Sequence, residues 1–328
     1  MALEPNEVLI DGEVRQIDVW IEASDTYIRN NTKYSDWYVP GNVIAFRSGN
    51  RPQLKILDLQ GTADEPIVIC NKGKMTLETT SSYGIVFQNS QYIRLLGNTD
   101  PDIPETHGID VAKTGSGGMG VNIRSKSEYF EVAYIELHNL GFCGIMAKTD
   151  GAIGWTMHDV HLHHNYIHDT DGEGLYVGET KYPSHELSNI EINNNLILRT
   201  GWDLFQFSNC SEQLNIYNNT CWDGGLQNQN AQNKGLQVSN DSQDADIRDN
   251  VVGRTRSNFH INMSAGNVLI EHNYFDGDTT IASPGIFADE RESSIPGTPI
   301  TYQNNWFRSY KDALFQMYNN VNESQIYD

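Results

Sequence analysis

Three kinds of residue are scarce in this 328-residue sequence: cations, prolines and cysteines. Lys and Arg together number 22 against 43 Asp and Glu, and the net charge of −21 excludes general affinity for nucleic-acid phosphates. No apolar run reaches the length of a membrane-spanning helix, and residues 1–10 lack the basic and apolar regions of a secretory signal. We therefore expect a water-soluble chain that does not span a membrane and binds no nucleic acid.

The four cysteines contain no CxxC pair and have no regular spacing. The sequence therefore indicates neither a zinc knuckle nor a disulfide framework. We expect Cys70, Cys143, Cys210 and Cys221 to be buried free thiols. The alternative, in an exported protein, is a disulfide between Cys210 and Cys221.

Asparagine and glycine, in contrast, are abundant, with 33 Asn and 28 Gly in the chain. Both tolerate left-handed backbone conformations, so the chain must turn often. The segments between the turns are rich in β-branched and aromatic residues, which favour short strands over amphipathic helices. We predict an all-β fold.

One pattern recurs six times: an apolar residue, any residue, an apolar residue, two residues, Asn, any residue, an apolar residue. The asparagines of these copies are Asn165, Asn195, Asn219, Asn250, Asn273 and Asn305. Their spacing of 23 to 32 residues is that of the coils of a parallel β-helix, whereas a leucine-rich repeat needs more Leu and a β-propeller blade more residues. We expect each Asn to lie at a tight bend in left-handed geometry, with its amide hydrogen-bonded. A related segment, residues 130–137, has Ile135 in the Asn position.

Further strands follow the repeats, and most begin with glycine: Gly84, Gly120, Gly144, Gly174, Gly235 and Gly285. Two or three short strands per repeat, followed by a return to the start, predict a solenoid in which inward apolar residues form columns. In this arrangement any site is built from outward side chains of neighbouring coils.

Over roughly residues 40–307 the sequence resembles the right-handed parallel β-helix proteins of the pectin-lyase-like superfamily. Residues 40–46 and 61–69 look like the opening coils of the chondroitinase B and alginate lyase group, polysaccharide lyase family 6. The fold prediction is thus an all-β, single-stranded right-handed parallel β-helix with an N-terminal cap. We expect residues 1–39 to cap the solenoid, residues 40–308 to form it, and residues 309–328 to be a C-terminal cap or last coil.

A local group of cations is the first candidate site. Arg124 and Lys148 occupy equivalent positions in adjacent coils, about 4.8 Å apart in backbone spacing. With Lys126, Asn122 and Tyr176 they are suited to bind the carboxylates of a uronic-acid polymer, so that a base can remove the C5 proton. Alternatively these cations are merely solvated.

The resemblance adds roles for this strip. Residues 122–127 are similar to the family segment that holds a catalytic Lys, and Lys148 lies near the position of a family Arg. The chain departs from the family in having Lys there, and in having Met119 and Val121 where acidic metal ligands are expected.

Histidines and acids crowd the next repeat. His158, His161, His163, His164 and His168 lie within eleven residues, so that two or three can converge on a transition metal such as Zn²⁺, unless they crowd by chance on turns.

Three acids follow in the bend before Gly174. Asp169, Asp171 and Glu173 offer the oxygen ligands that Ca²⁺ prefers, and Asp203 occupies the matching place one coil later, next to Trp202. Asp171, Glu173 or Asp203 could instead be the paired acids of a glycosidase, or simply solvated loop acids.

Aromatic residues accumulate over residues 150–225 and offer stacking surfaces for sugar rings. They are Trp155, Tyr176, Tyr182, Trp202, Tyr217 and Trp222. The polar loop 222–233 fits the wall of a groove.

We interpret the chain as an exported carbohydrate-active β-helix: a polysaccharide lyase acting on a uronic-acid polymer by β-elimination. The alternatives are a glycoside hydrolase with paired carboxylates and a noncatalytic glycan-binding or surface-structural solenoid. We expect a monomer that is secreted, periplasmic or on the cell surface, with Ca²⁺ as the one expected cofactor. The predicted catalytic residues are Lys148, Arg124, Lys126 and Glu173, the substrate contacts Asn122, Tyr176, Trp202, Asp203 and His161, and the metal ligands Asp169, Asp171 and Glu173.

Overall fold

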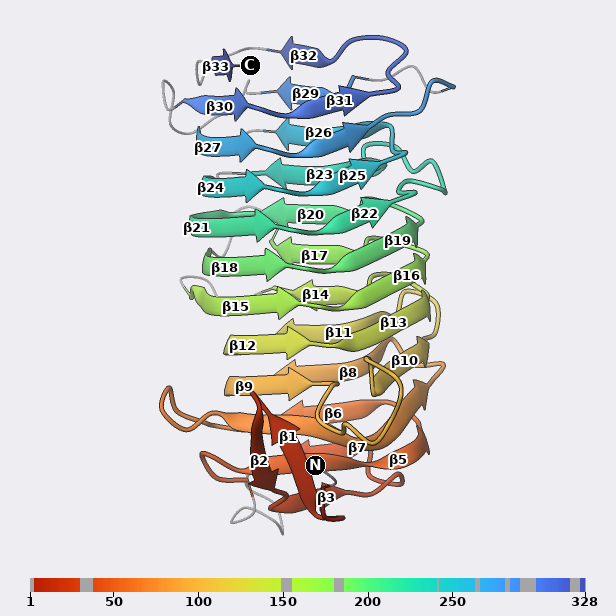
Figure 1. Ribbon diagram of the computed structural model, residues 1–328, viewed down its shortest axis with the longest axis vertical. Helices are drawn as coiled ribbons and strands as arrows, with labels where there is room; N and C mark the ends of the chain where they lie inside the picture. Colours follow the sequence, from red (N-terminus) through yellow and green to blue (C-terminus); the bar gives the residue numbers. More distant parts are fainter. Residues whose placement is uncertain are drawn as a thin grey trace.

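Each repeat of the sequence forms one coil of short strands, and successive coils stack in parallel along one axis (Figure 1). The computed structural model describes residues 3–29, 38–148, 155–179, 186–240, 242–262, 266–280, 284–289, 299–318 and 325–327. Three stacks of strands make the three sides of the coil. The first and second stacks belong to one 20-stranded sheet, because β5 and β7 run continuously around the corner between them, and the third is an 11-stranded sheet.

The first stack contains β3 (Val19–Ile21), β5 (Val43–Arg51), β7 (Ile67–Glu78), β9 (Gln91–Leu96), β12 (Glu128–Ala133), β15 (Met157–His163), β18 (Leu187–Asn193), β21 (Cys210–Tyr217), β24 (Gln243–Arg248), β27 (Gly266–Glu271), β30 (Ile300–Gln303) and β33 (Gln325–Tyr327). The second stack continues from β5 and β7 with β10 (Ile109–Lys113), β13 (Ile135–Leu140), β16 (Tyr166–Thr170), β19 (Leu196–Thr200), β22 (Thr220–Trp222), β25 (Val251–Gly253), β28 (Tyr274–Asp276) and β31 (Trp306–Arg308). The third stack contains β4 (Tyr27–Arg29), β6 (Leu54–Leu57), β8 (Tyr83–Gln88), β11 (Met119–Arg124), β14 (Ile145–Ala147), β17 (Leu175–Gly178), β20 (Phe205–Ser208), β23 (Lys234–Ser239), β26 (Ser257–Asn262), β29 (Ile286–Asp289) and β32 (Phe315–Tyr318).

The core is a set of apolar columns inside the coil. Alternation along each strand sends every second side chain inward, so that Ile190 and Ile192 of β18 are buried while Glu191 between them is half-exposed. The parallel register then places Ile190 between Val160 of β15 and Leu214 of β21. The all-β solenoid predicted from the repeats is confirmed.

The repeated asparagines form a buried ladder at the corner between the first and second stacks, which we call the asparagine corner (Asn165, Asn195, Asn219, Asn250, Asn273 and Asn305). The Asn219 amide donates to Asn250 Oδ1 at 3.0 Å, and its own oxygen accepts from Asn195. Left-handed geometry falls one residue earlier than predicted, for example at Asn218 (φ 55°). The Ile135 backbone N–H donates to Asn165 Oδ1, as its place in the repeat implies.

The N-terminal strands begin the solenoid before residue 40. Strand β3 pairs with β5, and β4 pairs with β6, so both already belong to the coil. The antiparallel hairpin of β1 (Glu7–Ile10) and β2 (Glu13–Gln16) packs Val8 and Ile10 in a cluster with Val43 and Val68, against the outside of the coil. A capping role for residues 1–39 stays a prediction. After residue 308, β32 and β33 extend two of the stacks.

All four cysteines are buried and free, as expected, so Cys210 and Cys221 do not pair. None of the described segments forms a long apolar helix of the kind that crosses a membrane.

Candidate functional site

A second polar column lies at the corner between the second and third stacks, which we call the acid corner (Cys143, Glu173, Asp203 and Lys234). Cys143, Glu173 and Asp203 come just before a strand of the third stack and Lys234 begins one, in each case at the position that most often precedes the opening glycine. The Gly144 N–H donates to the Glu173 carbonyl and the Gly174 N–H to the Asp203 carbonyl, both at 3.1 Å. The acid corner therefore stacks one residue per coil, at the strand spacing of about 4.8 Å.

Glu173 and Asp203 are buried acids of unusual proton affinity. Glu173 is 1% exposed and Asp203 0% exposed. Burial raises the pKa of Glu173 to about 8, with a further contribution from the negative charge of Asp203. Burial also raises the pKa of Asp203 to about 7, although the hydrogen bond from the Lys234 backbone N–H opposes the rise.

The carboxyl groups of this pair are short of hydrogen bonds. Among the described residues neither oxygen of Glu173 has a partner, and Asp203 uses only Oδ1, which accepts from the Lys234 N–H at 2.6 Å. A buried carboxyl group without partners costs the fold free energy. Such a pair fits a site that exchanges protons better than one that holds the fold together.

Covered polar groups continue onto the outward face of the third stack. The register puts Asn122, Met146, Tyr176, Gln206 and Gln237 in one outward row across β11, β14, β17, β20 and β23. Asn122 and Gln206 are each only 3% exposed although they point outward, and their amide oxygens lack partners within the described part of the chain. This row runs beside the acid corner.

Three aromatic rings lie near the acid corner. The Phe142 ring meets Tyr176 edge-on at 6.4 Å and Trp202 edge-on at 5.4 Å between centroids. Phe142 and Trp202 each lie directly beside an acid-corner residue in the chain, and Tyr176 follows Glu173 by three residues. Tyr176 and Trp202 are both half-exposed, so they present a surface on which a sugar ring can stack.

The predicted basic strip is not a set of free cations. Arg124 donates two hydrogen bonds, at 2.6 and 2.7 Å, to the side-chain oxygen of Gln88 in the preceding coil. Lys148 lies 3.6 Å from the carboxylate of Glu179, with its ammonium 5.7 Å from the centre of the Tyr176 ring. Lys126 is exposed in the turn that follows β11.

The three predicted calcium ligands do not face one point. Asp169 is held by Arg199 and His168, at 2.7 and 2.6 Å, on the outside of the second stack. Asp171 accepts from Gln227, whereas Glu173 is buried in the acid corner. Within the described ranges no three His, Cys, Asp or Glu side chains come together as a metal site. These residues do not fit Ca²⁺.

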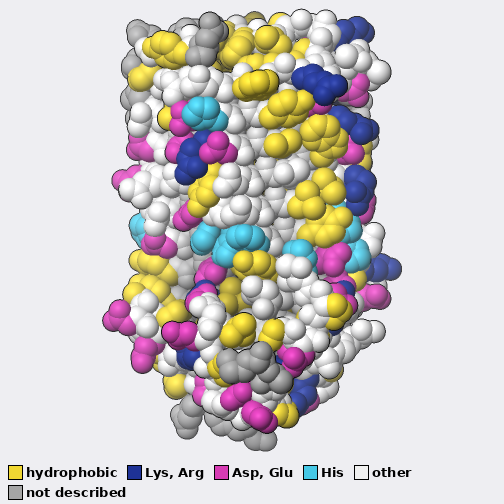
Figure 2. Space-filling view, in the orientation of Figure 1, with side chains coloured by type: hydrophobic (Ala, Val, Ile, Leu, Met, Phe, Trp, Pro, Cys, Tyr) yellow, Lys and Arg dark blue, Asp and Glu magenta, His cyan; other side chains and the backbone are white. Residues whose placement is uncertain are grey.

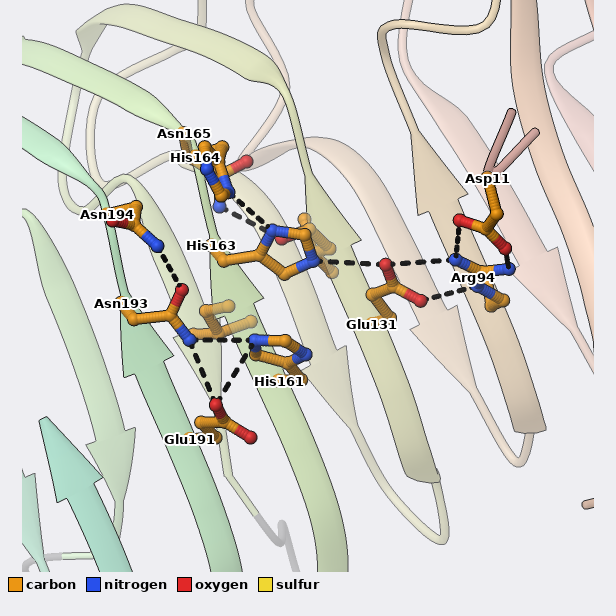
Figure 3. A network of polar contacts seen from close by, with 12 residues as sticks. Asp11, Arg94, Glu131, His161, His163, His164, Asn165, Glu191, Asn193 and Asn194 are labelled. Atoms are coloured by element: carbon orange, nitrogen blue, oxygen red, sulfur yellow. Dashed lines mark hydrogen bonds and ion pairs between the residues drawn. The ribbon is translucent and has the colours of Figure 1, made fainter. Parts of the chain in front are cut away.

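The histidines lie on the first and second stacks, where Figure 2 shows them in a band across the face that these stacks make. His163 bridges Glu131 and His164, and Glu131 continues through Arg94 to Asp11 of the N-terminal hairpin (Figure 3). Burial alone would raise the pKa of Glu131, but hydrogen bonds from His163 and Arg94 outweigh it and lower this pKa to about 2.

The side chains of this network bond to one another, and within the described ranges these histidines do not gather with acids or cysteines into a group that could hold a metal ion. His161 is bonded to Asn193 at 2.9 Å and lies 3.9 Å from Glu191 (Figure 3). His168 stacks on His138 at 4.9 Å. A substrate contact by His161 stays a prediction, on a face away from the acid corner.

Of the predicted site residues, the structure brings together Glu173, Asp203, Tyr176 and Trp202, with Asn122 and Lys148 on the same side of the coil. Sequence reasoning missed Lys234, although it precedes Gly235 as Glu173 precedes Gly174. It also missed Glu179 and Gln206, which carry no signal in the sequence beyond being polar residues near a strand end. Tyr182 lies outside the described residues.

No family model and no curated protein matches the sequence. Among solved structures, the alginate lyase from Paenibacillus sp. str. FPU-7 is similar at 15% identity and a TM-score of 0.62, over 92% of this chain and 99% of that one. A GH136 lacto-N-biosidase from Eubacterium ramulus is similar at 12% identity and a TM-score of 0.59, over 88% of this chain but only 62% of that one. At such identities the likeness shows the fold alone: the chain is a parallel β-helix, the architecture of these two enzymes.

Proposed function

We propose that the chain hydrolyses glycosidic bonds of a polysaccharide, with Glu173 and Asp203 as its acid–base pair. The observation that carries this proposal is the pair itself: two buried carboxyl groups, one coil apart, with pKa values raised to about 8 and about 7. Near neutral pH the pair shares one proton, and Asp203, which has the lower pKa, ionises first. The sequence alone favours β-elimination over hydrolysis. The geometry favours hydrolysis, because the cations that elimination would use, Arg124 and Lys148, already contact Gln88 and Glu179.

The two carboxyl groups supply the two parts of the reaction. Glu173 donates its proton to the glycosidic oxygen as the bond to the anomeric carbon breaks, and the Asp203 carboxylate attacks that carbon. Water then gives a proton to Glu173 and its hydroxyl group to the sugar, which releases Asp203. The spacing of one coil is nearer the carboxyl separation of retaining glycosidases than that of inverting ones.

The surroundings support a sugar as the substrate. Tyr176 and Trp202 are half-exposed rings beside the pair, and they suit the apolar C–H faces of a sugar. The two similar structures are named as an alginate lyase and a lacto-N-biosidase, both enzymes of glycans. Because both carboxyl groups are covered, the proposal requires that a bound sugar displaces part of that cover. Secretion to where such polymers occur stays a prediction.

The test is incubation with a panel of polysaccharides in heavy-oxygen water. Hydrolysis creates new reducing ends that carry the heavy oxygen, whereas elimination creates an unsaturated, ultraviolet-absorbing end without it. We expect labelled ends and no absorbance. Unlabelled, absorbing products would reject hydrolysis, and an absence of new ends on every polymer would reject the enzyme.

Variants of the pair connect the reaction to the acid corner. Glu173→Gln and Asp203→Asn should each lower kcat by about a thousandfold, because each removes one proton-transfer or nucleophilic role. The matched control is Asp223→Asn, which should keep wild-type turnover. Asp223 is a partly exposed acid that forms an ion pair with Arg254 of the next coil. Full turnover by Glu173→Gln would reject the assignment.

The pH profile follows from the same pair. The rate should fall below about pH 7 as Asp203 takes up a proton, and above about pH 8 as Glu173 loses its proton. A rate that stays level across this window would show that neither group titrates in the rate-limiting step.

A second candidate reaction is β-elimination, which requires that a substrate carboxylate displaces Glu179 from Lys148. The Lys148 ammonium lies 3.6 Å from the Glu179 carboxylate and 5.7 Å from the centre of the Tyr176 ring, so a cation and a phenol that can act as the base occur together. If the product is unsaturated, Lys148→Ala should abolish its formation while Glu173→Gln retains it. The opposite result identifies the acid corner as the reacting site.

A further inference from the structure

A cavity of about 290 Å³ opens beside the acid corner, on the side of the later coils. Its lining includes Asn233, Lys234, Arg256, Ser257 and Phe287, from the loop before β23 and from the starts of β26 and β29. The register places Lys234 beside Ser257, and the Lys234 N–H is the group bonded to Asp203. The cavity is therefore one coil from the candidate acids.

The two cations of this cavity lack acidic partners. The Lys234 ammonium donates to Asn233 Oδ1 at 2.9 Å, and within the described ranges neither Lys234 nor Arg256 forms an ion pair. The nearby Arg254, in contrast, pairs with Asp223 at 2.9 Å. On a chain with a net charge of −21, two neighbouring cations without carboxylates are unusual.

These cations also oppose each other. Burial lowers the pKa of Lys234; the negative charge of Asp203 opposes this, and the positive charge of Arg256 adds a smaller lowering. Two like charges at the mouth of a partly buried cavity are stabilised when an anion lies between them. Arg256 is exposed and Lys234 half-buried, so a ligand can reach both.

We infer that this cavity binds the anionic group, a carboxylate or a sulfate ester, of one sugar residue next to the bond that is cleaved. The cavity volume suits a single sugar ring, and Phe287 with Pro284 gives it an apolar wall for the ring face. The substrate class is therefore an acidic polysaccharide, bound by Lys234 and Arg256. The place of the cleaved bond rests on the proposed function, whereas the binding of the anion does not.

The test is titration calorimetry with trisaccharides of alginate, pectate and unsulfated chondroitin, each next to its methyl ester, which has the same sugars without the charge. A sulfated chondroitin trisaccharide tells sulfate from carboxylate. The Glu173→Gln protein is used so that turnover does not interfere. At least one free acid should bind about tenfold or more tightly than its ester, as charge-assisted hydrogen bonds imply.

Variants show which side chains cause the tighter binding of the free acid. Arg256→Gln and Lys234→Met should each remove most of the difference in affinity between acid and ester. The matched control Arg254→Gln, two residues from Arg256, should retain this difference. Arg256 is exposed, so its replacement leaves the fold intact even if Lys234→Met does not fold. Equal affinity for acids and esters, no binding of any acid, or an Arg256→Gln protein with the wild-type preference would each overturn the inference.

The outcome is separable from that of the proposed function. A charge preference that depends on Arg256, in a wild-type protein that cleaves nothing, would support the anion site and reject the enzyme. Cleavage that depends on Glu173, by a protein that binds acids and esters equally well, would support the enzyme and reject the anion site.

Discussion

The asparagine corner and the acid corner are two edges of the same coil, and both carry a column of buried polar side chains. Asn219 is 1% exposed, and its two amide N–H groups are shared among three acceptors at 3.0 Å, the carbonyls of Ile192 and Tyr217 and the side-chain oxygen of Asn250. Glu173 is equally buried, yet within the described residues neither carboxyl oxygen has a partner. The two side chains are thus equally buried, but one has its hydrogen-bond partners and the other has none among the residues described.

The difference separates stability from function. A buried polar group whose bonds are all made fixes the geometry of the coil, and repeating it from coil to coil makes the corner regular. A buried polar group without partners destabilises the fold, and a protein retains one where chemistry needs it. Removing a polar side chain should therefore have opposite effects on stability at the two corners.

The largest expected effect is at the asparagine corner. Asn219→Ala leaves the N–H groups of Asn195 and the carbonyl of Ile192 without their partner, so we expect a loss of about 4 kcal/mol in the free energy of unfolding. Denaturant titration followed by circular dichroism measures this loss.

The matched control for Asn219→Ala is Asn215→Ala, a half-exposed Asn of the same coil that is outside the ladder. It should change the free energy of unfolding by less than about 0.5 kcal/mol. Equal losses for the two variants would mean that the ladder contributes no more than the surface does.

The next effect has the opposite sign. Glu173→Gln should stabilise the protein at neutral pH by about 2 kcal/mol while it lowers kcat by about a thousandfold. The pKa of Glu173 is raised from 4.5 to about 8. Between these two pH values the carboxyl group is protonated in the folded state but ionised in the unfolded state. Wild-type stability therefore falls as the pH rises through this window, and a neutral Gln removes that dependence.

Melting temperatures of both proteins from about pH 4 to about pH 8 test this sign. The two curves should meet at the acidic end, where the carboxyl group is protonated in both states, and separate as the pH rises. Asp223→Asn should follow the wild type throughout. A Glu173→Gln protein that melts below the wild type at neutral pH would contradict the idea of a destabilising buried acid.

The asparagine corner can be predicted from the sequence more fully than the acid corner. The ladder is visible because one residue type recurs at one place, and the bonds that hold it are made by that residue. The left-handed position was misplaced by one residue because His164, Asn194 and Asn218 are of mixed type and do not stand out. The sequence shows which residue repeats, whereas the backbone angles of the residue before it depend on the hydrogen bonds of the ladder.

The acid corner is harder to predict because its members differ: Cys143, Glu173, Asp203 and Lys234. The matching places of Glu173 and Asp203 are visible from the repeat, but their burial depends on how the coils pack and is not visible in the sequence. The contacts of the cations are hidden in the sequence for a related reason. Whether Arg124, Lys148 or Arg256 has a partner depends on contacts with other coils or strand ends, which counting charges does not reveal.

The smallest expected effect tests whether burial sets the strength of the ladder. Asn305 ends it: its oxygen accepts two hydrogen bonds from Asn273 at 3.0 Å, but its side chain is only half-buried. Water can therefore reach the groups that Asn305→Ala leaves, and we expect a loss of about 1 kcal/mol, well below that of Asn219→Ala. Hydrogen exchange should show faster exchange of the Asn273 amide with protection at Asn195 unchanged. A loss as large as that of Asn219→Ala would mean that the ladder acts as one cooperative unit, in which a missing bond costs the same at any depth.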